Sequence, residues 1–146
     1  MNKKNLWIIA LIVLPVVAMI VANFPNAVTY QYPDGHAVQM SYMGLNEDVN
    51  AGVCMPAVVV TVGLCILFAV AYLGGKKAYW LKAISGPSFA AALLAVVPYL
   101  APEEVRALPN VLVPILMMVE WLVAFQMGKT VESADMQKEK GRRLSR

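Results

Sequence analysis

The residue best suited to chemistry in this 146-residue chain is Glu120, an acid inside the apolar run NVLVPILMMVEWLVAFQMG (residues 110–128). A charged side chain at the centre of a bilayer costs about 3 kcal/mol, so it needs a proton, a polar partner or a wet cavity. Counting along the other apolar runs places Thr61 and Ser88 within about one helical turn of the same depth. We expect a hydroxyl group from one of them to bond the carboxyl. This fits a proton or cation relay, a contact with a partner helix, or a structural bond that fixes helix register.

The sequence shows no pattern typical of a catalytic or metal site. One histidine and two separated cysteines do not give the spacing of a zinc site. No HExxH motif, phosphate-binding loop or adjacent nucleophile and base is present. We therefore expect no enzymatic activity, no metal and no cofactor.

The elements that must position Glu120 are predicted to be membrane-spanning helices. Hydrophobic residues make up 60% of the chain and charged residues 14%, which is too apolar for a soluble domain of this size. The four apolar runs are 6–22, 53–73, 84–100 and 111–127. Since the backbone must satisfy its own hydrogen bonds in lipid, the runs predict an all-α membrane protein with one four-helix domain over residues 1–146.

The basic residues predict how the chain is threaded. Of the 12 lysines and arginines, two precede the first run, three lie between the second and third, and six follow the fourth, in the tail 129–146; Arg106 alone falls on the other side. Cytoplasmic loops carry the excess of such residues, so we expect both termini in the cytoplasm and a location in the plasma membrane. This distribution explains the positive charge without nucleic acid as a partner.

Residues 27–42 are predicted to form an external β-hairpin between the first two helices. The turn Pro33-Asp34-Gly35 suits a three-residue loop, with glycine in the left-handed position. This loop opposes Tyr32 to His36 and puts the apolar and aromatic side chains on one face. The predicted face comprises Val28, Tyr30, Tyr32, Val38 and Met40.

An isolated hairpin is marginally stable, so this face is expected to rest on the helix ends, the lipid surface or a partner. The residues we single out for partner binding are Tyr30, Tyr32, Asp34 and His36. The other external segment, 101–109, is expected to be a short link with one helical turn beginning at Pro102.

The opening of the chain resembles the SdpI-type bacterial membrane family. The similarity covers about the first 40 residues and consists of a proline-containing first helix, Phe24-Pro25, Val28 and the Asp34-Gly35 turn. Thr29 stands where the family has a second proline, and Tyr30-Gln31 stands where a histidine is typical. The resemblance implies a bacterial membrane protein, and in some members an immunity role against a secreted toxic peptide.

Two classes of function follow from these expectations. In the first, the protein is a non-enzymatic binding or accessory module whose hairpin recognises a peptide or a membrane-protein partner. In the second, it is a homo-oligomeric transporter or channel in which Glu120 is the proton or cation site.

Overall fold

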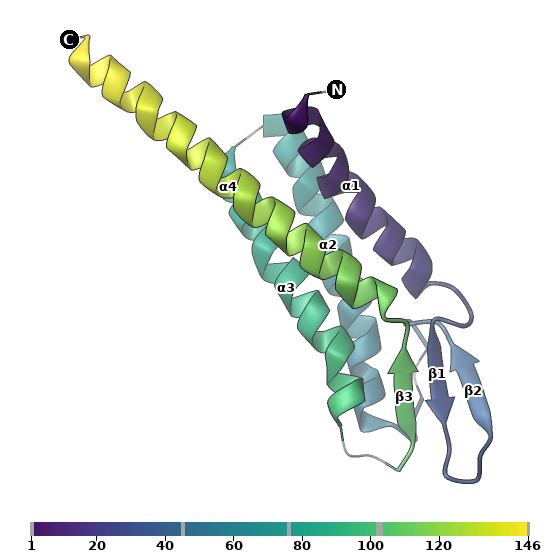
Figure 1. Cartoon of the computed structure of the whole chain (residues 1–146). Coiled ribbons are helices and arrows are strands. Elements are labelled where there is room, and N and C mark those ends of the chain that lie inside the picture. Colours follow the sequence, from purple (N-terminus) through teal and green to yellow (C-terminus); the bar gives the residue numbers. More distant parts are fainter. Residues whose placement is uncertain (1, 45, 76, 102–103, 146) are drawn as a thin grey trace.

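The computed structural model describes residues 2–44, 46–75, 77–101 and 104–145. Four helices run side by side, and a small sheet lies at one end of them (Figure 1). The helices are α1 (Lys3–Ala22), α2 (Cys54–Gly75), α3 (Ala78–Leu100) and α4 (Leu112–Leu144), with a 3₁₀ turn, η1 (Asn50–Val53), leading into α2. The strands are β1 (Val28–Gln31), β2 (Ala37–Met40) and β3 (Arg106–Pro109).

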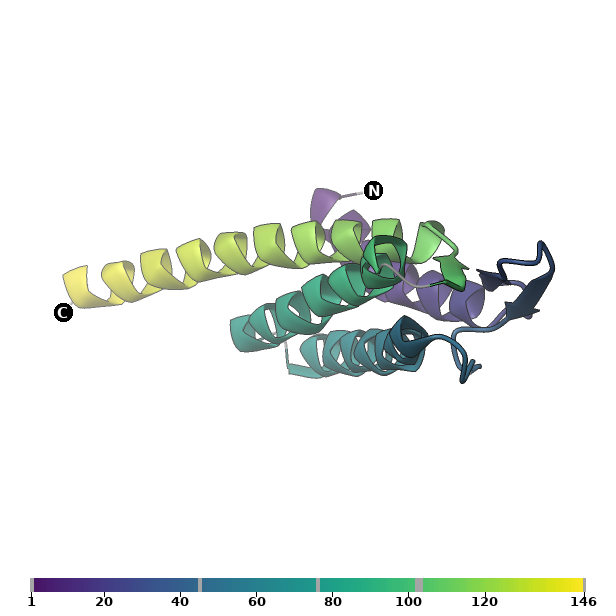
Figure 2. The ribbon, with the colours of Figure 1, turned by 90° about the horizontal axis from the view of Figure 1, so that it is seen from below.

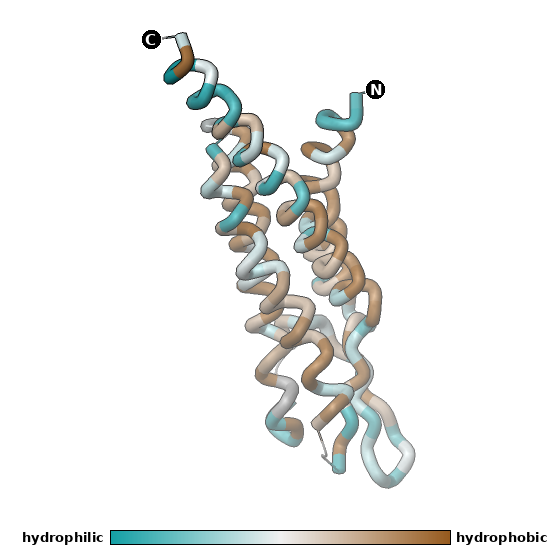
Figure 3. Tube along the Cα trace, turned by 60° about the vertical axis from the view of Figure 1, so that its left-hand side comes forward, coloured by the Kyte–Doolittle hydropathy of each residue, from teal (hydrophilic) through white to brown (hydrophobic). Residues whose placement is uncertain are grey.

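All four helices are long and apolar enough to cross a membrane. They contain 20, 22, 23 and 33 residues, and large hydrophobic side chains remain exposed on each of them. Figure 3 shows these hydrophobic residues over the middle of the bundle, whereas hydrophilic residues gather at its ends and along the last part of α4. The chain therefore fits a multi-pass membrane protein, as the apolar runs predict.

The helices pack in a ring, with each helix against its neighbours in sequence and α1 against α4. In this arrangement α2 and α4 occupy diagonal positions. Small side chains fill much of the shared core, which lets the helix backbones approach closely. The buried alanines of the helices are Ala18, Ala22, Ala69, Ala91, Ala92, Ala95 and Ala124.

The polar tail 129–146 is expected to be a frayed helix at the membrane surface. In the structure it is helical and continues α4 without a break to Leu144, so that α4 projects beyond the other helices (Figures 1 and 2). Its residues are mostly good helix formers, such as Lys, Glu, Gln and Met. An ion pair between Glu132 and Lys82 of α3 holds the start of this extension.

The predicted hairpin is confirmed, including its register. Val28 pairs with Met40, and Tyr30 pairs with Val38. The Tyr32 N–H donates to the His36 carbonyl at 3.0 Å, which closes the loop Pro33-Asp34-Gly35. Gly35 has φ of 94°, the left-handed conformation that the turn requires.

The sheet has a third strand that the sequence does not predict. The strand order is β2-β1-β3, and β3 pairs antiparallel with β1, so that Tyr30 lies opposite Ala107. The expected helical turn at Pro102 lies outside the described residues, but 106–109 is extended rather than helical. The hairpin is thus one part of a sheet that also includes the link between α3 and α4.

Hydrogen bonds fix this sheet to the ends of the helices. The Tyr42 N–H donates to the carbonyl of Ala22, the last residue of α1, and the Asn110 N–H donates to the Ala27 carbonyl, each at 2.8 Å. The Tyr42 hydroxyl donates to the Asn110 carbonyl at 3.0 Å. These bonds tie the end of α1 and the start of α4 to the same small sheet.

Candidate functional site

Glu120 occupies a core position of α4. It lies on the face that also carries Met117, Val123 and Ala124, and its side chain is 0% exposed. Neither carboxyl oxygen has a hydrogen-bond partner among the described residues. A buried polar group without a partner costs about 1–3 kcal/mol on the scale of protein mutational data. Glu120 is therefore the least satisfied buried side chain of the bundle.

Two other fully buried side chains that can form hydrogen bonds are Cys65 of α2 and Ser88 of α3. The Ser88 hydroxyl donates to the Ile84 carbonyl at 2.8 Å, and the Cys65 thiol donates to the same carbonyl at 3.9 Å. Both side chains are fully buried. The structure thus brings Cys65 and Ser88 to one carbonyl of α3, the helix that packs against both α2 and α4.

The expected bond from Thr61 or Ser88 to Glu120 is not formed. The Thr61 hydroxyl instead donates to the carbonyls of Ala57 at 3.1 Å and Val58 at 2.8 Å, within its own helix. A serine or threonine in a helix can satisfy its hydroxyl with the carbonyl three or four residues earlier, so it has little need of a partner on another helix. Thr61 also belongs to α2, which lies diagonally across the bundle from α4.

Because no other side chain bonds to the Glu120 carboxyl within the described residues, the reactions open to it are few. A lone carboxyl can bind or release one proton, or offer oxygen ligands to a cation once water or a partner reaches it. Within the described ranges, no group of three or more His, Cys, Asp and Glu side chains is placed to hold a metal ion. Among the residues that the structure describes, Glu120 is therefore the one buried carboxyl.

At the sheet end, the structure divides the four residues predicted for partner binding. Tyr30 is 0% exposed because its side chain faces the helix ends, whereas Asp34 and His36 are exposed at the tip of the hairpin. Of the three supports expected for the hairpin face, the helix ends are the one observed. Tyr30 is therefore unavailable to a partner in this conformation, and burial raises the pKa of its hydroxyl.

The hairpin tip is ordered by local contacts. The Tyr32 and His36 rings stack with centroids 4.2 Å apart and an interplanar angle of 11°. The His36 backbone N–H donates to the Asp34 carboxylate at 3.0 Å, and the His36 ring also contacts that carboxylate. The backbone bond is the main reason that the pKa of Asp34 lies below its ordinary value.

A cleft of about 530 Å³ opens beside the hairpin. It is lined by Tyr32, Pro33, Asp48, Asn50, Glu104 and Val105. The Tyr32 hydroxyl donates to the Asp48 carboxylate at 3.0 Å and accepts from the Asn46 amide, also at 3.0 Å. Two carboxylates and a tyrosine ring therefore face one open space.

No pattern in the sequence places Asp48 and Glu104 beside Tyr32. Asn46 was missed altogether, although it is one of the few buried polar residues, at 8% exposure. The asparagine two residues before an aspartate is a weak turn signal, and the Asn46 side chain does accept from the Asp48 N–H at 3.0 Å. Its bond to Tyr32 depends on a contact across the chain that no local pattern reveals.

The sequence matches no family model and no curated protein, and the structure matches no solved structure. The resemblance to the SdpI-type family thus stays a prediction, and the case for function depends on the geometry of the Glu120 core and of the cleft beside the hairpin.

Proposed function

We propose that the chain is a non-enzymatic binding module of a bacterial plasma membrane, whose cleft beside the hairpin receives a positively charged segment of a peptide or membrane-protein partner. The observation that carries this proposal is the open cleft lined by Tyr32, Asp48 and Glu104. An aromatic ring beside two carboxylates suits a lysine or arginine side chain, which can stack on the ring and pair with the acids. An immunity-like role against a secreted cationic peptide is one form of this function.

The distribution of charge supports both the partner's sign and the orientation. Asp34, Asp48 and Glu104 lie at the sheet end, where Arg106 is the one basic residue of the described part of the chain. The lysines of α1 and the basic end of α4 lie at the opposite end. The excess of basic residues there favours a cytoplasmic location for both termini, which leaves the acidic cleft outside the cell.

The rigidity of the sheet favours binding. β1 pairs with a strand on each side, and Tyr42 and Asn110 tie the sheet to the helix ends. The Tyr32 hydroxyl is held by Asn46 and Asp48. Because these groups are ordered before a partner arrives, little entropy is lost when they bind it.

Peptide binding in nanodiscs of neutral lipid tests this proposal. A fluorescent octalysine peptide should bind the wild-type chain, and Asp48→Asn with Glu104→Gln should weaken binding about three- to tenfold, because two exposed ion pairs are lost. Asp135→Asn with Glu139→Gln removes two acids from the far part of α4 and serves as the matched control. Equal affinity for the wild type and the cleft variant would refute the proposal.

A second function is favoured by the two unpartnered carboxyl oxygens of Glu120. In this alternative the chain forms an oligomeric transporter or channel, and the carboxyl carries a proton or cation after a conformational change admits water to the core. Glu120→Gln should then abolish the flux of protons or cations into proteoliposomes while the protein is still inserted. The control variant Glu139→Gln should leave this flux unchanged. Normal flux in the Glu120→Gln protein would exclude this function.

A further inference from the structure

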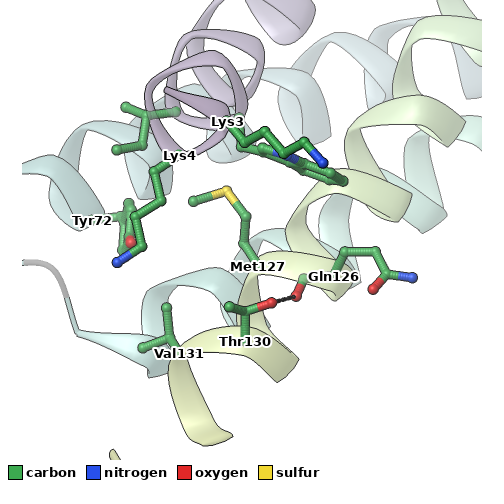
Figure 4. Close-up of a pocket in the computed structure, with 9 residues that line it drawn as sticks. Lys3, Lys4, Tyr72, Gln126, Met127, Thr130 and Val131 are labelled. Carbon is green, nitrogen blue, oxygen red and sulfur yellow. Dashed lines mark hydrogen bonds between the residues drawn. The ribbon is translucent and has the colours of Figure 1, made fainter. Parts of the chain in front are cut away.

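A groove lies at the end of the bundle opposite the sheet, between α1, α2 and α4 (Figure 4). Its volume is about 390 Å³. It is lined by Lys3, Lys4, Trp7, Ile8, Tyr72, Gln126, Met127, Thr130 and Val131. The groove is remote from the cleft of the proposed function and shares no residue with it.

The lining of the groove is amphipathic. Met127 is nearly buried at 9% exposure, and the half-buried Trp7, Ile8 and Val131 add to the apolar surface. The two lysines are exposed and reach from the first turn of α1, as Figure 4 shows. None of the lining residues is acidic. The site thus offers an apolar wall together with two positive charges.

Among the described residues, no carboxylate forms an ion pair with Lys3 or Lys4. The ion pairs within the described ranges join Asp34 with His36, Glu132 with Lys82, and Glu139 with Arg143. The start of α1 adds further donors, because the Asn2 side chain makes no capping hydrogen bond and no acid lies in the first turn. The free backbone N–H groups and the helix dipole at this terminus favour an anion.

We propose that this groove binds one anionic phospholipid from the leaflet at this end of the bundle. The phosphate lies near the first turn of α1, where the Lys3 and Lys4 side chains flank the groove on either side (Figure 4). The upper part of one acyl chain lies against Trp7 and Met127, and the rest continues along the exposed apolar surface of the helices. A basic pocket between spanning helices at the membrane interface is the kind of site that selects anionic headgroups. This inference does not depend on the function proposed for the cleft.

The fluorescence of Trp7 provides a direct readout, because this ring is part of the groove. Trp80→Phe and Trp121→Phe leave Trp7 as the single tryptophan of the chain. The protein is reconstituted in phosphatidylcholine bilayers that contain brominated phosphatidylglycerol or brominated phosphatidylcholine as quencher. Since each lysine near the surface contributes about fivefold, the anionic lipid should bind about 25-fold more strongly than the neutral one.

Three variants distinguish a built site from general attraction. Lys3→Gln with Lys4→Gln should reduce the preference at least about tenfold, whereas Lys138→Gln with Lys140→Gln, which removes the same charge from the far part of α4, should leave it unchanged. Thr130→Phe fills the groove without altering charge and should also reduce the preference, which keeps the test valid if the lysine variant fails to insert.

Equal quenching by the two lipids would overturn the proposal. An equal loss of the preference for anionic lipid in the Lys3/Lys4 variant and in the Lys138/Lys140 variant would also overturn it, since that result would indicate diffuse electrostatic attraction. Displacement of the lipid by millimolar inorganic phosphate would indicate a simple ion site instead, because it would show that the apolar wall makes no contribution.

Discussion

Glu120→Met replaces the buried carboxyl by an apolar group of similar length and volume. The side chain is 0% exposed and neither oxygen has a partner among the described residues, so the substitution removes two unsatisfied polar atoms and creates no cavity. The corresponding penalty is about 1–3 kcal/mol. We therefore expect Glu120→Met to raise the free energy of unfolding by this amount.

Glu120→Gln is the matched comparison, because an amide of the same shape retains two polar atoms in the same place. Its free energy of unfolding should lie within about 0.5 kcal/mol of the wild-type value. Both variants can be measured by reversible unfolding in mixed micelles of a mild detergent and dodecyl sulfate, followed by circular dichroism. If Glu120→Met instead lowers the free energy of unfolding by more than about 1 kcal/mol, the carboxyl makes a stabilising bond, for example across a subunit interface, and the reasoning is wrong.

Three further predictions concern the sheet end. Gly35→Ala should destabilise the protein by about 1 kcal/mol, because φ is 94° and a side chain there has space but disfavours this backbone conformation. Gly35→Asn should cost less, since asparagine tolerates the left-handed region better than alanine. Equal unfolding curves for the wild type and the two variants would contradict this prediction. Tyr42→Phe removes the part-buried hydrogen bond to the Asn110 carbonyl and should cost about 1 kcal/mol, seen as faster hydrogen exchange of the Asn110 amide. The carboxyl of Asp34 should titrate by NMR below its ordinary pKa of 3.8. Most of this shift should survive His36→Ala, since the main donor is the backbone N–H of residue 36. The stability that the Asp34 carboxylate contributes is present above pH 3.8 and is lost as the pH falls through the lowered pKa.

The parts of the fold that the sequence predicts are those with a strong local signal. The apolar runs gave the helices, and the loop Pro33-Asp34-Gly35 set the hairpin register because a shift of one residue would have turned Val28 and Tyr30 to the opposite face. β3 gave no such signal. Its four residues, Arg106-Ala-Leu-Pro109, are too few for a period to emerge, and the strand exists because β1 offers it a free edge.

The environment of the candidate site was only partly predictable. Counting along the helices predicts one depth for Glu120, Thr61, Cys65 and Ser88, since depth follows from helical rise. Of these residues, Cys65 and Ser88 share the Ile84 carbonyl as their acceptor. The hydrogen bond to Glu120 was wrongly predicted, because a hydroxyl in a helix can be satisfied by its own backbone. The cleft combines Tyr32, Asp48 and Glu104 from segments far apart in the chain, so its geometry depends on the tertiary fold.

The strand order β2-β1-β3 bears on how the helices acquire their relative directions as the chain folds. β1 and β2 can pair as soon as the first hairpin has been synthesised, but a two-stranded hairpin is marginal by itself. Completion of the sheet must wait for residues 106–109, which follow α3. Those residues reach β1 only if the end of α3 lies on the hairpin side of the bundle. A molecule with α3 inverted would leave β1 with an open edge and would lack the bond from Asn110 to Ala27, so the sheet discriminates between the correct and the inverted topology.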